Sequence, residues 1–215
     1  MLFLSGSSLA QTEKVSQENF SLPNSKIVNL NLKFASHITV KPWEKNEIGL
    51  KTTLLYSSED FAKIHQQKVE EKGSALNITT DYDMSDFKNE DYNCWSCDNY
   101  KEDVNCKCLK VSYEVYAPQH AILNLETISG DIELLNFRGE IRVKTISGFV
   151  DFSLQANAKS DVQFKSVTGE IYTDFDINLD KGSTAYSKKV NTSINGGGSK
   201  ISLETISGDI YFRKI

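Results

Sequence analysis

A ten-residue phrase recurs four times in the second half of the chain, and this repetition constrains the fold more than any other feature. The copies are LETISGDIEL at 125–134, VKTISGFVDF at 143–152, FKSVTGEIYT at 164–173 and LETISGDIYF at 203–212. In each copy, two segments with apolar residues at alternate positions flank a small residue and a glycine. Alternation at period two is typical of strands, and glycine permits tight corners. The copies therefore predict a repeat architecture whose unit is a strand, a corner and a second strand.

The spacing of the first corner glycines indicates how the copies stack. Gly130, Gly139 and Gly148 follow one another at intervals of nine residues, so 18 residues hold two corners. Strands of about six residues, each roughly 20 Å long, fit this interval. These values predict an all-β fold, a flattened and right-handed β-solenoid in which residue i lies about 4.8 Å from residue i+18.

The other corner glycines, Gly169 and Gly208, come after longer intervals of 21 and 39 residues. We interpret the first interval as one coil with a bulge near 156–160. The second fits about two coils with an insertion near 176–189. The copies are therefore expected to stack in the order in which they occur along the chain.

Aligned positions in the four copies predict which side chains are internal. Three columns are apolar and are expected to form the core. A column of hydroxyl residues is expected to form a ladder just inside the corner, and a charged column is expected to face outward with opposite charges side by side. The apolar columns are Leu125, Val143, Phe164 and Leu203; Ile128, Ile146, Val167 and Ile206; and Ile132, Val150, Ile171 and Ile210. The hydroxyl column is Thr127, Thr145, Ser166 and Thr205, and the charged column is Glu126, Lys144, Lys165 and Glu204.

The first residues of the chain resemble a targeting segment followed by a linker. Residues 1–10 are apolar and small, as at the end of a signal peptide cut after Ala10, although a disordered terminus would look similar. Residues 11–25 are polar and are expected to be a tether. The signal-like segment favours a location outside the cytoplasm, either in the periplasm or at the cell surface.

The region at 26–118 is expected to contain further strands, which form either a degenerate coil or a β cap over one end of the solenoid. Ser58 and the acidic residues after it predict one helix at 58–73. An irregular loop is expected at 81–108. The repeats at 119–215 are expected to continue from this region as one domain.

Composition excludes two classes of function. The chain has a net charge of -5 and a pI near 5.3, whereas nucleic-acid binding requires a strongly basic face. No run of 18 apolar residues occurs, so no transmembrane segment is expected. Nothing in the composition suggests a cofactor.

Four cysteines, Cys94, Cys97, Cys106 and Cys108, lie within 15 positions of the 81–108 loop. Two disulfides are favoured because an exported protein meets an oxidising environment. A tetrahedral zinc site and free thiols remain alternatives.

The start of the same loop is acidic. Asp81, Asp83 and Asp86 could supply oxygen ligands to calcium, but the segment lacks the glycine and the distal glutamate of an EF-hand loop. A solvated acidic loop is the favoured interpretation.

Aromatic residues also gather in this loop, namely Tyr82, Tyr92, Trp95 and Tyr100. Such rings bury a large area at low entropic cost and are common in recognition surfaces. A small satellite core packed on the cysteines is the equal alternative.

Acidic residues after the corner glycines raise the question of catalysis. Asp131, Glu170 and Asp209 occupy one column and could form a glycosidase-like carboxylate pair. However, Phe149 interrupts the column, and aspartate beside glycine is common in turns. We therefore expect a protein that is not an enzyme.

Three segments resemble the bacterial putative-adhesin family of β-strand-repeat proteins. They are ITVKPWEKNEIGLKT at 38–52, YEVYAPQHAILNLETISGDIEL at 113–134 and GGGSKISLETISGDIYF at 196–212. The resemblance covers about residues 26–215 and implies an extracytoplasmic β-solenoid-like domain with an adhesive or scaffolding role. The family supplies no catalytic residues, and the cysteine loop is not part of its pattern.

The leading functional hypothesis is a non-catalytic binding or adhesion module that presents a rigid surface to a protein or glycan of the cell envelope. The second is a structural or envelope-sensing scaffold that docks a partner, or another copy in a homo-oligomer, through an edge of the solenoid. A polysaccharide-active enzyme is the third.

Overall fold

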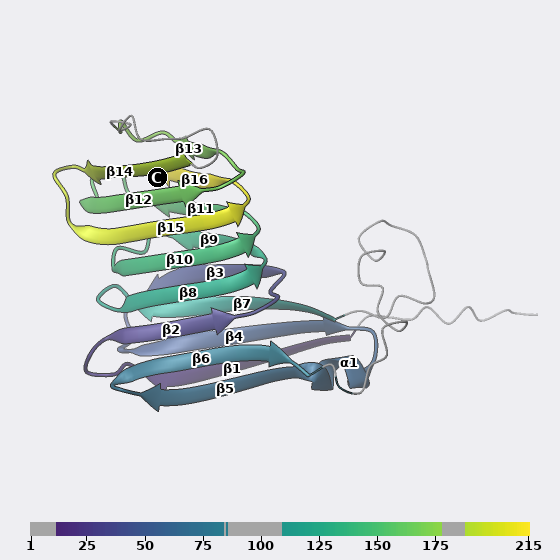
Figure 1. Ribbon diagram of the computed structural model, residues 1–215. Coiled ribbons are helices and arrows are strands. Elements are labelled where there is room, and N and C mark those ends of the chain that lie inside the picture. The colour runs from purple at the N-terminus through teal and green to yellow at the C-terminus, as the bar shows by residue number, and fades with distance from the viewer. Residues whose placement is uncertain (1–11, 84, 86–108, 178–187) are drawn as a thin grey trace, which may run out of the picture.

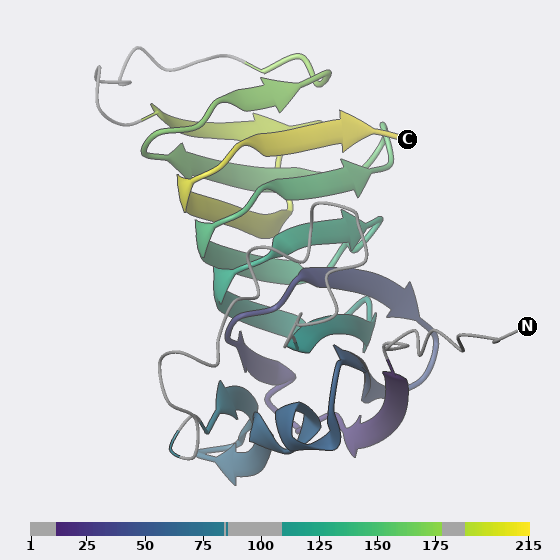
Figure 2. The ribbon, with the colours of Figure 1, turned by 90° about the vertical axis from the view of Figure 1, so that its right-hand side faces the viewer.

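The computed structural model describes residues 12–83, 85, 109–177 and 188–215, and strands make up most of this part of the chain. The strands form two eight-stranded sheets whose inner faces pack on one another, as Figures 1 and 2 show. Successive coils place one strand in each sheet. The architecture is the flattened, solenoid-like stack that the repeats predict.

Sheet A runs in the order β1 (Thr12–Ser21), β4 (Glu47–Tyr56), β7 (Leu109–Pro118), β3 (His37–Trp43), β9 (Asp131–Leu135), β11 (Val150–Leu154), β16 (Ile210–Lys214) and β13 (Ile171–Thr173). Sheet B runs in the order β14 (Lys188–Ile194), β12 (Ser160–Ser166), β15 (Ser199–Ser207), β10 (Glu140–Ser147), β8 (Ile122–Ser129), β2 (Ile27–Leu32), β6 (Ala75–Tyr82) and β5 (His65–Lys72). The helix α1 (Glu59–Ile64) connects β4 to β5. No helix in the described ranges combines the length and apolarity that a membrane span requires.

The register between the first two copies confirms the interval of 18 residues. Leu125 pairs with Val143 in sheet B, and Ile132 pairs with Val150 in sheet A, both in parallel strands. All four side chains are fully buried. Side chains at equivalent positions of the two copies therefore lie above one another in both walls of the stack.

The stacking order of the last two copies differs from the chain order that we expected. The fourth copy lies between the second and the third, because Leu203 on β15 pairs with Val143 on one side and with Phe164 on the other. In sheet A, β16 likewise separates β11 from β13. The apolar columns align equally well in either order, so they do not determine which copy is inserted.

The N-terminal strands continue both walls of the stack. Leu30 on β2 pairs with Leu125 of the first repeat and with Ile78 on β6. In sheet A, β3 pairs with β9 in parallel, and β7 and β4 follow. The region that was expected to be a degenerate coil or a cap is thus hydrogen-bonded to the repeats in register.

Two expectations for the N-terminal region are wrong. Part of the predicted tether is the ten-residue strand β1, which pairs with β4 along its whole length. Its polar side chains are tolerated because an edge strand can leave both faces in water while its backbone is paired.

The predicted helix at 58–73 ends at Ile64, and residues 65–72 form β5 against β6. The turn between these strands has φ of 59° at Gly73 and 70° at Ser74. Two consecutive positive φ values match the twist of a two-residue hairpin. Phe61 and Ile64 are the buried side chains of α1, so only one turn and a half of helix has an apolar face.

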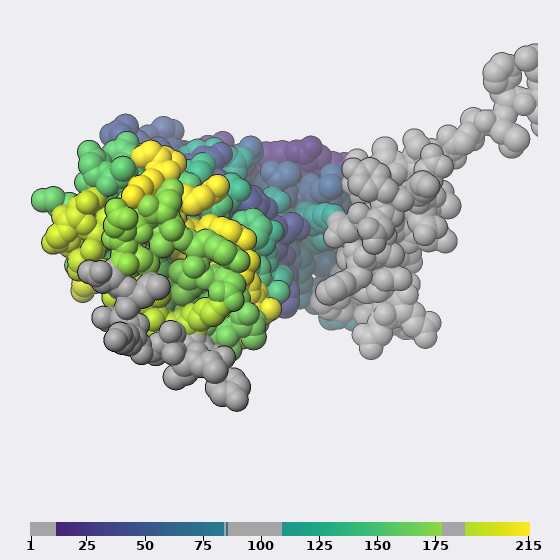
Figure 3. All heavy atoms as spheres, turned by 90° about the horizontal axis from the view of Figure 1, so that it is seen from above, coloured from purple at the N-terminus to yellow at the C-terminus, as the bar shows by residue number. Residues whose placement is uncertain are grey.

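The core lies between the two sheets and becomes aromatic toward β13. Phe212 is fully buried, and its ring centroid lies 5.8 Å from that of Phe152, 5.0 Å from that of Phe164 and 4.7 Å from that of Phe175. Figure 3 looks down on this end of the stack, where residues coloured green to yellow are gathered. Ring packing of this kind adds to the burial of apolar area.

The hydroxyl column lies inside the corner, as predicted, but its members do not bond to one another. Thr127 donates to the carbonyl of Leu32 at 2.7 Å, and Thr145 donates to that of Ser147 at 3.1 Å. Each hydroxyl therefore satisfies a backbone acceptor where the chain turns from one sheet to the other.

The corner glycines form a column of close backbone contacts. Gly130, Gly148 and Gly208 have φ of 121°, 124° and 149°, which favour glycine. A Cβ at Gly148 would collide with the carbonyl oxygen of Gly130. Gly139 and Gly169 lack such a φ and are instead required by space, because a Cβ at Gly139 would lie 2.6 Å from the carbonyl oxygen of Ala121.

We expect Gly148→Ala to lower the free energy of unfolding by about 3 kcal/mol or more, because it combines an unfavourable φ with a collision against backbone. Gly196→Ala is the matched control, since Gly196 has φ of 88° but no atom within 4 Å of the added Cβ. This control should cost about 1 kcal/mol. Urea titration of both variants measures the difference, and equal losses would contradict the role of the corner contact.

A charged network on the outer face of sheet A connects three neighbouring strands. The carboxylate of Glu114 on β7 accepts hydrogen bonds from Lys41 of β3 at 2.6 Å and from Lys51 of β4 at 2.5 Å. The hydroxyl of Tyr116 donates to it at 2.8 Å. The hydrogen bonds from Lys41, Lys51 and Tyr116 lower the pKa of Glu114 to about 2.

This network predicts a pH dependence of stability. Because the folded pKa of Glu114 lies below its ordinary value of 4.5, its contribution is complete above that value and is lost as the pH falls toward about 2. Glu114→Gln should therefore cost about 1 kcal/mol near neutral pH and less on acidification. Denaturation at several pH values checks this, with the exposed Glu71→Gln on β5 as the control. A difference between wild type and Glu114→Gln that persists at pH values near 2 would contradict it.

Candidate functional site

The candidate site is a row of aliphatic side chains on the outer face of sheet B. We call Ile128, Ile146, Ile206 and Val167 the aliphatic row; they come from β8, β10 and β15 and from the residue after β12. Their exposed fractions are 36%, 48%, 46% and 38% in that order. Side by side at strand spacing, they make a continuous apolar strip on a wall whose other outward residues are mostly polar.

The outward position of this row corrects the prediction that it belongs to the core. Side chains alternate along a strand, so Thr127 and Ile128 cannot both point inward. Leu125 is buried two positions before Thr127, so alternation places the threonine inside and the isoleucine outside, and the threonine hydroxyl is satisfied there by a carbonyl at the corner. The same holds for Thr145 and Ile146 in the next coil.

A row of charged residues runs beside the aliphatic row, one outward position back along each strand. We call Glu126, Lys144, Glu204 and Lys165 the charge row, and in the observed stacking order their signs alternate. Lys144 Nζ lies 3.8 Å from Glu126 Oε1, and Lys165 Nζ lies 2.6 Å from Glu204 Oε1. The hydrogen bond from Lys165 is the main cause that lowers the pKa of Glu204.

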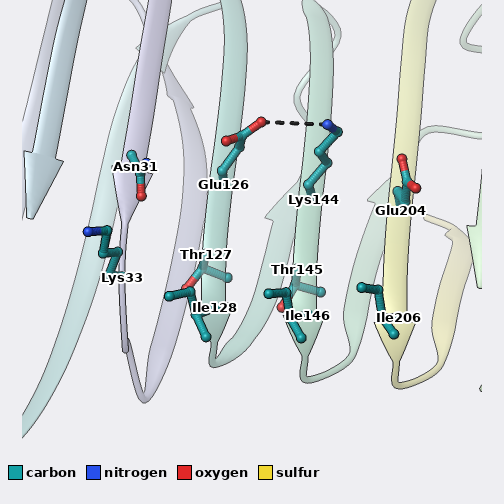
Figure 4. A pocket seen from close by; sticks show the side chains of 10 residues that line it. All are labelled: Asn31, Lys33, Glu126, Thr127, Ile128, Lys144, Thr145, Ile146, Glu204 and Ile206. Carbon is teal, nitrogen blue, oxygen red and sulfur yellow. Dashed lines mark ion pairs between the residues drawn. The ribbon is translucent and has the colours of Figure 1, made fainter.

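Figure 4 shows three isoleucines of the aliphatic row side by side at the ends of their strands, with the pair of Glu126 and Lys144 above them. The members of the two rows on β8, β10 and β15 line an open groove of about 400 Å³, which extends toward Asn31 and Lys33 beside β2. The groove has an apolar floor and a charged side. Such a surface can bind a complementary surface, and it has no enclosed pocket for a small substrate.

The two aspartates of the predicted catalytic column accept backbone hydrogen bonds, and Glu170 forms an ion pair with Lys188. Asp131 Oδ1 accepts the N–H of Phe149 at 3.2 Å, and Asp209 Oδ1 accepts the N–H of Glu170 at 2.8 Å. Each aspartate therefore connects its coil to the next one at the corner. This arrangement gives these carboxylates a structural use.

The calcium candidates are described only in part. Asp81 forms an ion pair with Lys33 at 2.8 Å and accepts the N–H of Tyr82 at 2.9 Å. Asp83 accepts the N–H of Ser85 at 3.0 Å. These hydrogen bonds, led by those from Lys33 and Ser85 respectively, lower the pKa of both carboxyl groups. Asp86 lies outside the described residues.

Within the described ranges, no three histidine, cysteine or acidic side chains come together as metal ligands would. The cysteine predictions cannot be compared with the structure, because they lie outside the described residues. They concern Cys94, Cys97, Cys106 and Cys108. Disulfide, metal and free-thiol states all stay predictions.

Among the aromatic candidates, Tyr82 is described, whereas Tyr92, Trp95 and Tyr100 lie outside the described residues. The hydroxyl of Tyr82 donates to the carbonyl of Phe34 at 3.0 Å, and its ring meets those of Phe34 and His65 edge to face. Tyr82 thus packs in a small cluster with Phe34 and His65, and both interpretations of the aromatic group stay predictions.

Comparison with known proteins identifies the fold family. A family profile described as Toastrack DUF4097 matches residues 55–213. The chain belongs to this family. The resemblance to bacterial adhesin-like repeat proteins seen in the sequence is therefore confirmed, and the Toastrack domain accounts for most of the two sheets.

One solved structure supports the same fold, and two further matches superpose less well. The chain is similar to a putative cell adhesion protein from Clostridium sporogenes ATCC 15579, with 13% identity, a TM-score of 0.55 and coverage of 96% of this chain and 100% of that chain. A putative adhesin from Bacteroides fragilis NCTC 9343 matches with 12% identity, a TM-score of 0.26 and coverage of 94% and 97%. A putative lipid binding protein from Parabacteroides distasonis ATCC 8503 matches with 9% identity, a TM-score of 0.27 and coverage of 94% and 96%. No curated protein sequence matches the chain.

The inward and outward columns predict opposite responses to the same substitution. Ile146→Ser should change the free energy of unfolding by less than about 1 kcal/mol, because the side chain already meets water. Val143→Ser, three positions earlier and fully buried, should cost about 2 kcal/mol or more. Urea titration of the two variants measures this contrast. A large loss for Ile146→Ser would place the aliphatic row in the core after all.

Proposed function

We propose that this Toastrack domain is a non-catalytic binding module of the cell envelope, located outside the cytoplasm in the periplasm or at the cell surface. The aliphatic row supports this most directly. Exposing four aliphatic side chains on adjacent strands is unfavourable in water and is typical of surfaces that are covered by a partner.

The rigidity of the wall supports the same proposal. The strands beneath the aliphatic row are paired on both sides, and the corner glycines fix the spacing between them. Binding to such a surface requires little ordering of the protein, so less of the interaction free energy is lost. A rigid, pre-formed strip suits adhesion or scaffolding better than a chemical step.

The kind of partner follows from the two rows. An envelope protein with its own apolar strip would cover the aliphatic row, and its charges could complement the charge row. A glycan is the alternative partner, but it would leave the aliphatic row mostly unpaired with apolar groups. We therefore favour a protein.

A second candidate is docking through an edge of the stack. The strand β1 forms an edge of sheet A with ten residues, nearly all of which are exposed. Such an edge can pair with a strand of another chain. We also propose, from the sequence, that the coils wind to the right and that the N-terminal strands cap one end.

The proposed function is tested by capture of envelope proteins on immobilised wild-type protein, followed by the same experiment with Ile146→Lys. A protein partner that covers the aliphatic row should lose at least tenfold in affinity when a charge is placed at its centre. A glycan array is included as a parallel measurement. Partners that bind wild type and Ile146→Lys equally would contradict the assignment of this wall as the binding surface.

The matched control is Leu135→Lys on β9. Leu135 is 39% exposed, so the substitution also adds a charge at an exposed aliphatic residue, but it lies in sheet A. This variant should bind as wild type does. A loss with both variants would indicate a general effect of charge and would not support the site.

A further inference from the structure

The alternation of the charge row has a geometric consequence. Glu126, Lys144, Glu204 and Lys165 lie on four neighbouring strands in the order β8, β10, β15 and β12. When this row of four alternating charges is turned end to end, a lysine lies wherever the original has a glutamate, and a glutamate lies wherever it has a lysine. The charge row is therefore complementary to its own reversed copy.

The aliphatic row has the same symmetry. Reversed, it places Val167 over Ile128 and Ile206 over Ile146, so each aliphatic side chain meets another one. The two rows are about 6.6 Å apart along the strands, which is two residues of β structure. A rotation that reverses the strand order while keeping the strand direction superimposes both rows on their complements at once.

We propose that this wall of sheet B binds a second copy of the same chain, about a two-fold axis parallel to the strands that passes between β10 and β15. The proposal rests on the proposed function, since it names the partner of the aliphatic row. In this dimer, Glu126 faces Lys165 of the second copy, and Lys144 faces Glu204 of the second copy. Four ion pairs then flank an apolar strip from which water is excluded.

Residues beside the two rows fit the same arrangement. Lys189 on β14 continues the charge row beyond Lys165, and it would face Asn31, which continues the row on β2. Arg142 on β10 would face Ser202 on β15. The flanking positions therefore bring no two like charges together.

Two different two-fold axes could place the two walls face to face, one parallel to the strands and one perpendicular to them. The charges favour the parallel axis. An axis perpendicular to the strands would keep the strand order, so that Glu126 would face Glu126 of the second copy and Lys144 would face its own equivalent. Like charges in direct opposition are unfavourable. The surface thus favours one dimer, which differs from docking through an edge of the sheets.

The size of the two rows sets the expected strength. Four half-exposed aliphatic side chains and four charges cover less than the roughly 800 Å² per partner of a standard interface. Association should therefore be weak and reversible, with a Kd on the order of 10 to 1000 μM. Copies held close together on one surface would associate more completely, since their effective concentration is high.

The test is sedimentation velocity on the purified chain from about 5 μM to about 1 mM, a range that brackets this Kd. Wild type should shift from monomer to dimer as concentration rises. Lys144→Glu should raise the Kd at least tenfold, because the introduced carboxylate would face that of Glu204 twice across the axis. Glu204→Lys should do the same by placing two lysines together.

Mixing the two variants separates this dimer from other effects of charge. Lys144→Glu in one copy and Glu204→Lys in the other make the pairs across the axis opposite in sign, so the mixture should dimerise more tightly than either variant alone. Neither substitution is in the core, and circular dichroism verifies that both variants are folded. A mixture that stays monomeric would overturn the proposed axis.

Ile146→Lys and Leu135→Lys examine the apolar part of the interface. The first should abolish the dimer, and the second, in sheet A, should leave its Kd within about twofold of wild type. A wild-type chain that stays monomeric at the highest concentration would overturn self-association. In that case the capture experiment still tests the proposed function. If wild type captures an envelope protein and Ile146→Lys does not, the aliphatic row is a binding surface for that protein and not for a second copy of the chain.

Discussion

The close approach of successive corners is the contact on which the rest of this structure depends. The carbonyl of Ala35 faces Gly130, whose carbonyl faces Gly148, and the series continues through Gly208 to Gly169. Side chains at these positions would separate the coils beyond hydrogen-bonding distance. Because the corners are in contact, the strands on either side pair in register, and the columns of the core and of the outer wall are aligned.

Much of the fold could be predicted from the sequence because period and spacing are physical quantities that can be read from it. The 18-residue interval and the burial of Leu125 and Ile132 follow from alternation and from the corner glycines. The outward position of Ile128 could not be found from hydrophobicity alone, which counts an isoleucine as a core residue. Alternation places it outside, because Ile128 lies three positions after the buried Leu125, and the hydroxyl of Thr127 is satisfied inside by a carbonyl at the corner.

The candidate site is harder to predict for a related reason. The sequence predicts that the charged column faces outward, but in chain order Lys144 is next to Lys165. The charges alternate only because the structure places Glu204 between the two lysines. Apolar columns that match in every copy leave the order of copies undetermined, whereas opposite charges on the outer wall favour the observed order. The polar segments 12–21 and 65–72 are edge strands, although the sequence predicts a tether and part of a helix there. A strand at a sheet edge pairs through its backbone, so it can have a polar composition that does not indicate a strand.

The insertion of the fourth copy between the second and the third affects the order in which the chain can fold. The third copy precedes the fourth in the chain, but its parallel neighbours in both walls, β15 and β16, belong to the fourth. Without them, the strand β12 of the third copy keeps only its antiparallel pairing with β14 among the described residues. The stack can therefore be completed only when the segment Ser199–Lys214 enters between the second copy and the third. Such dependence on sequence-distant partners makes closure of the stack a late and slow event.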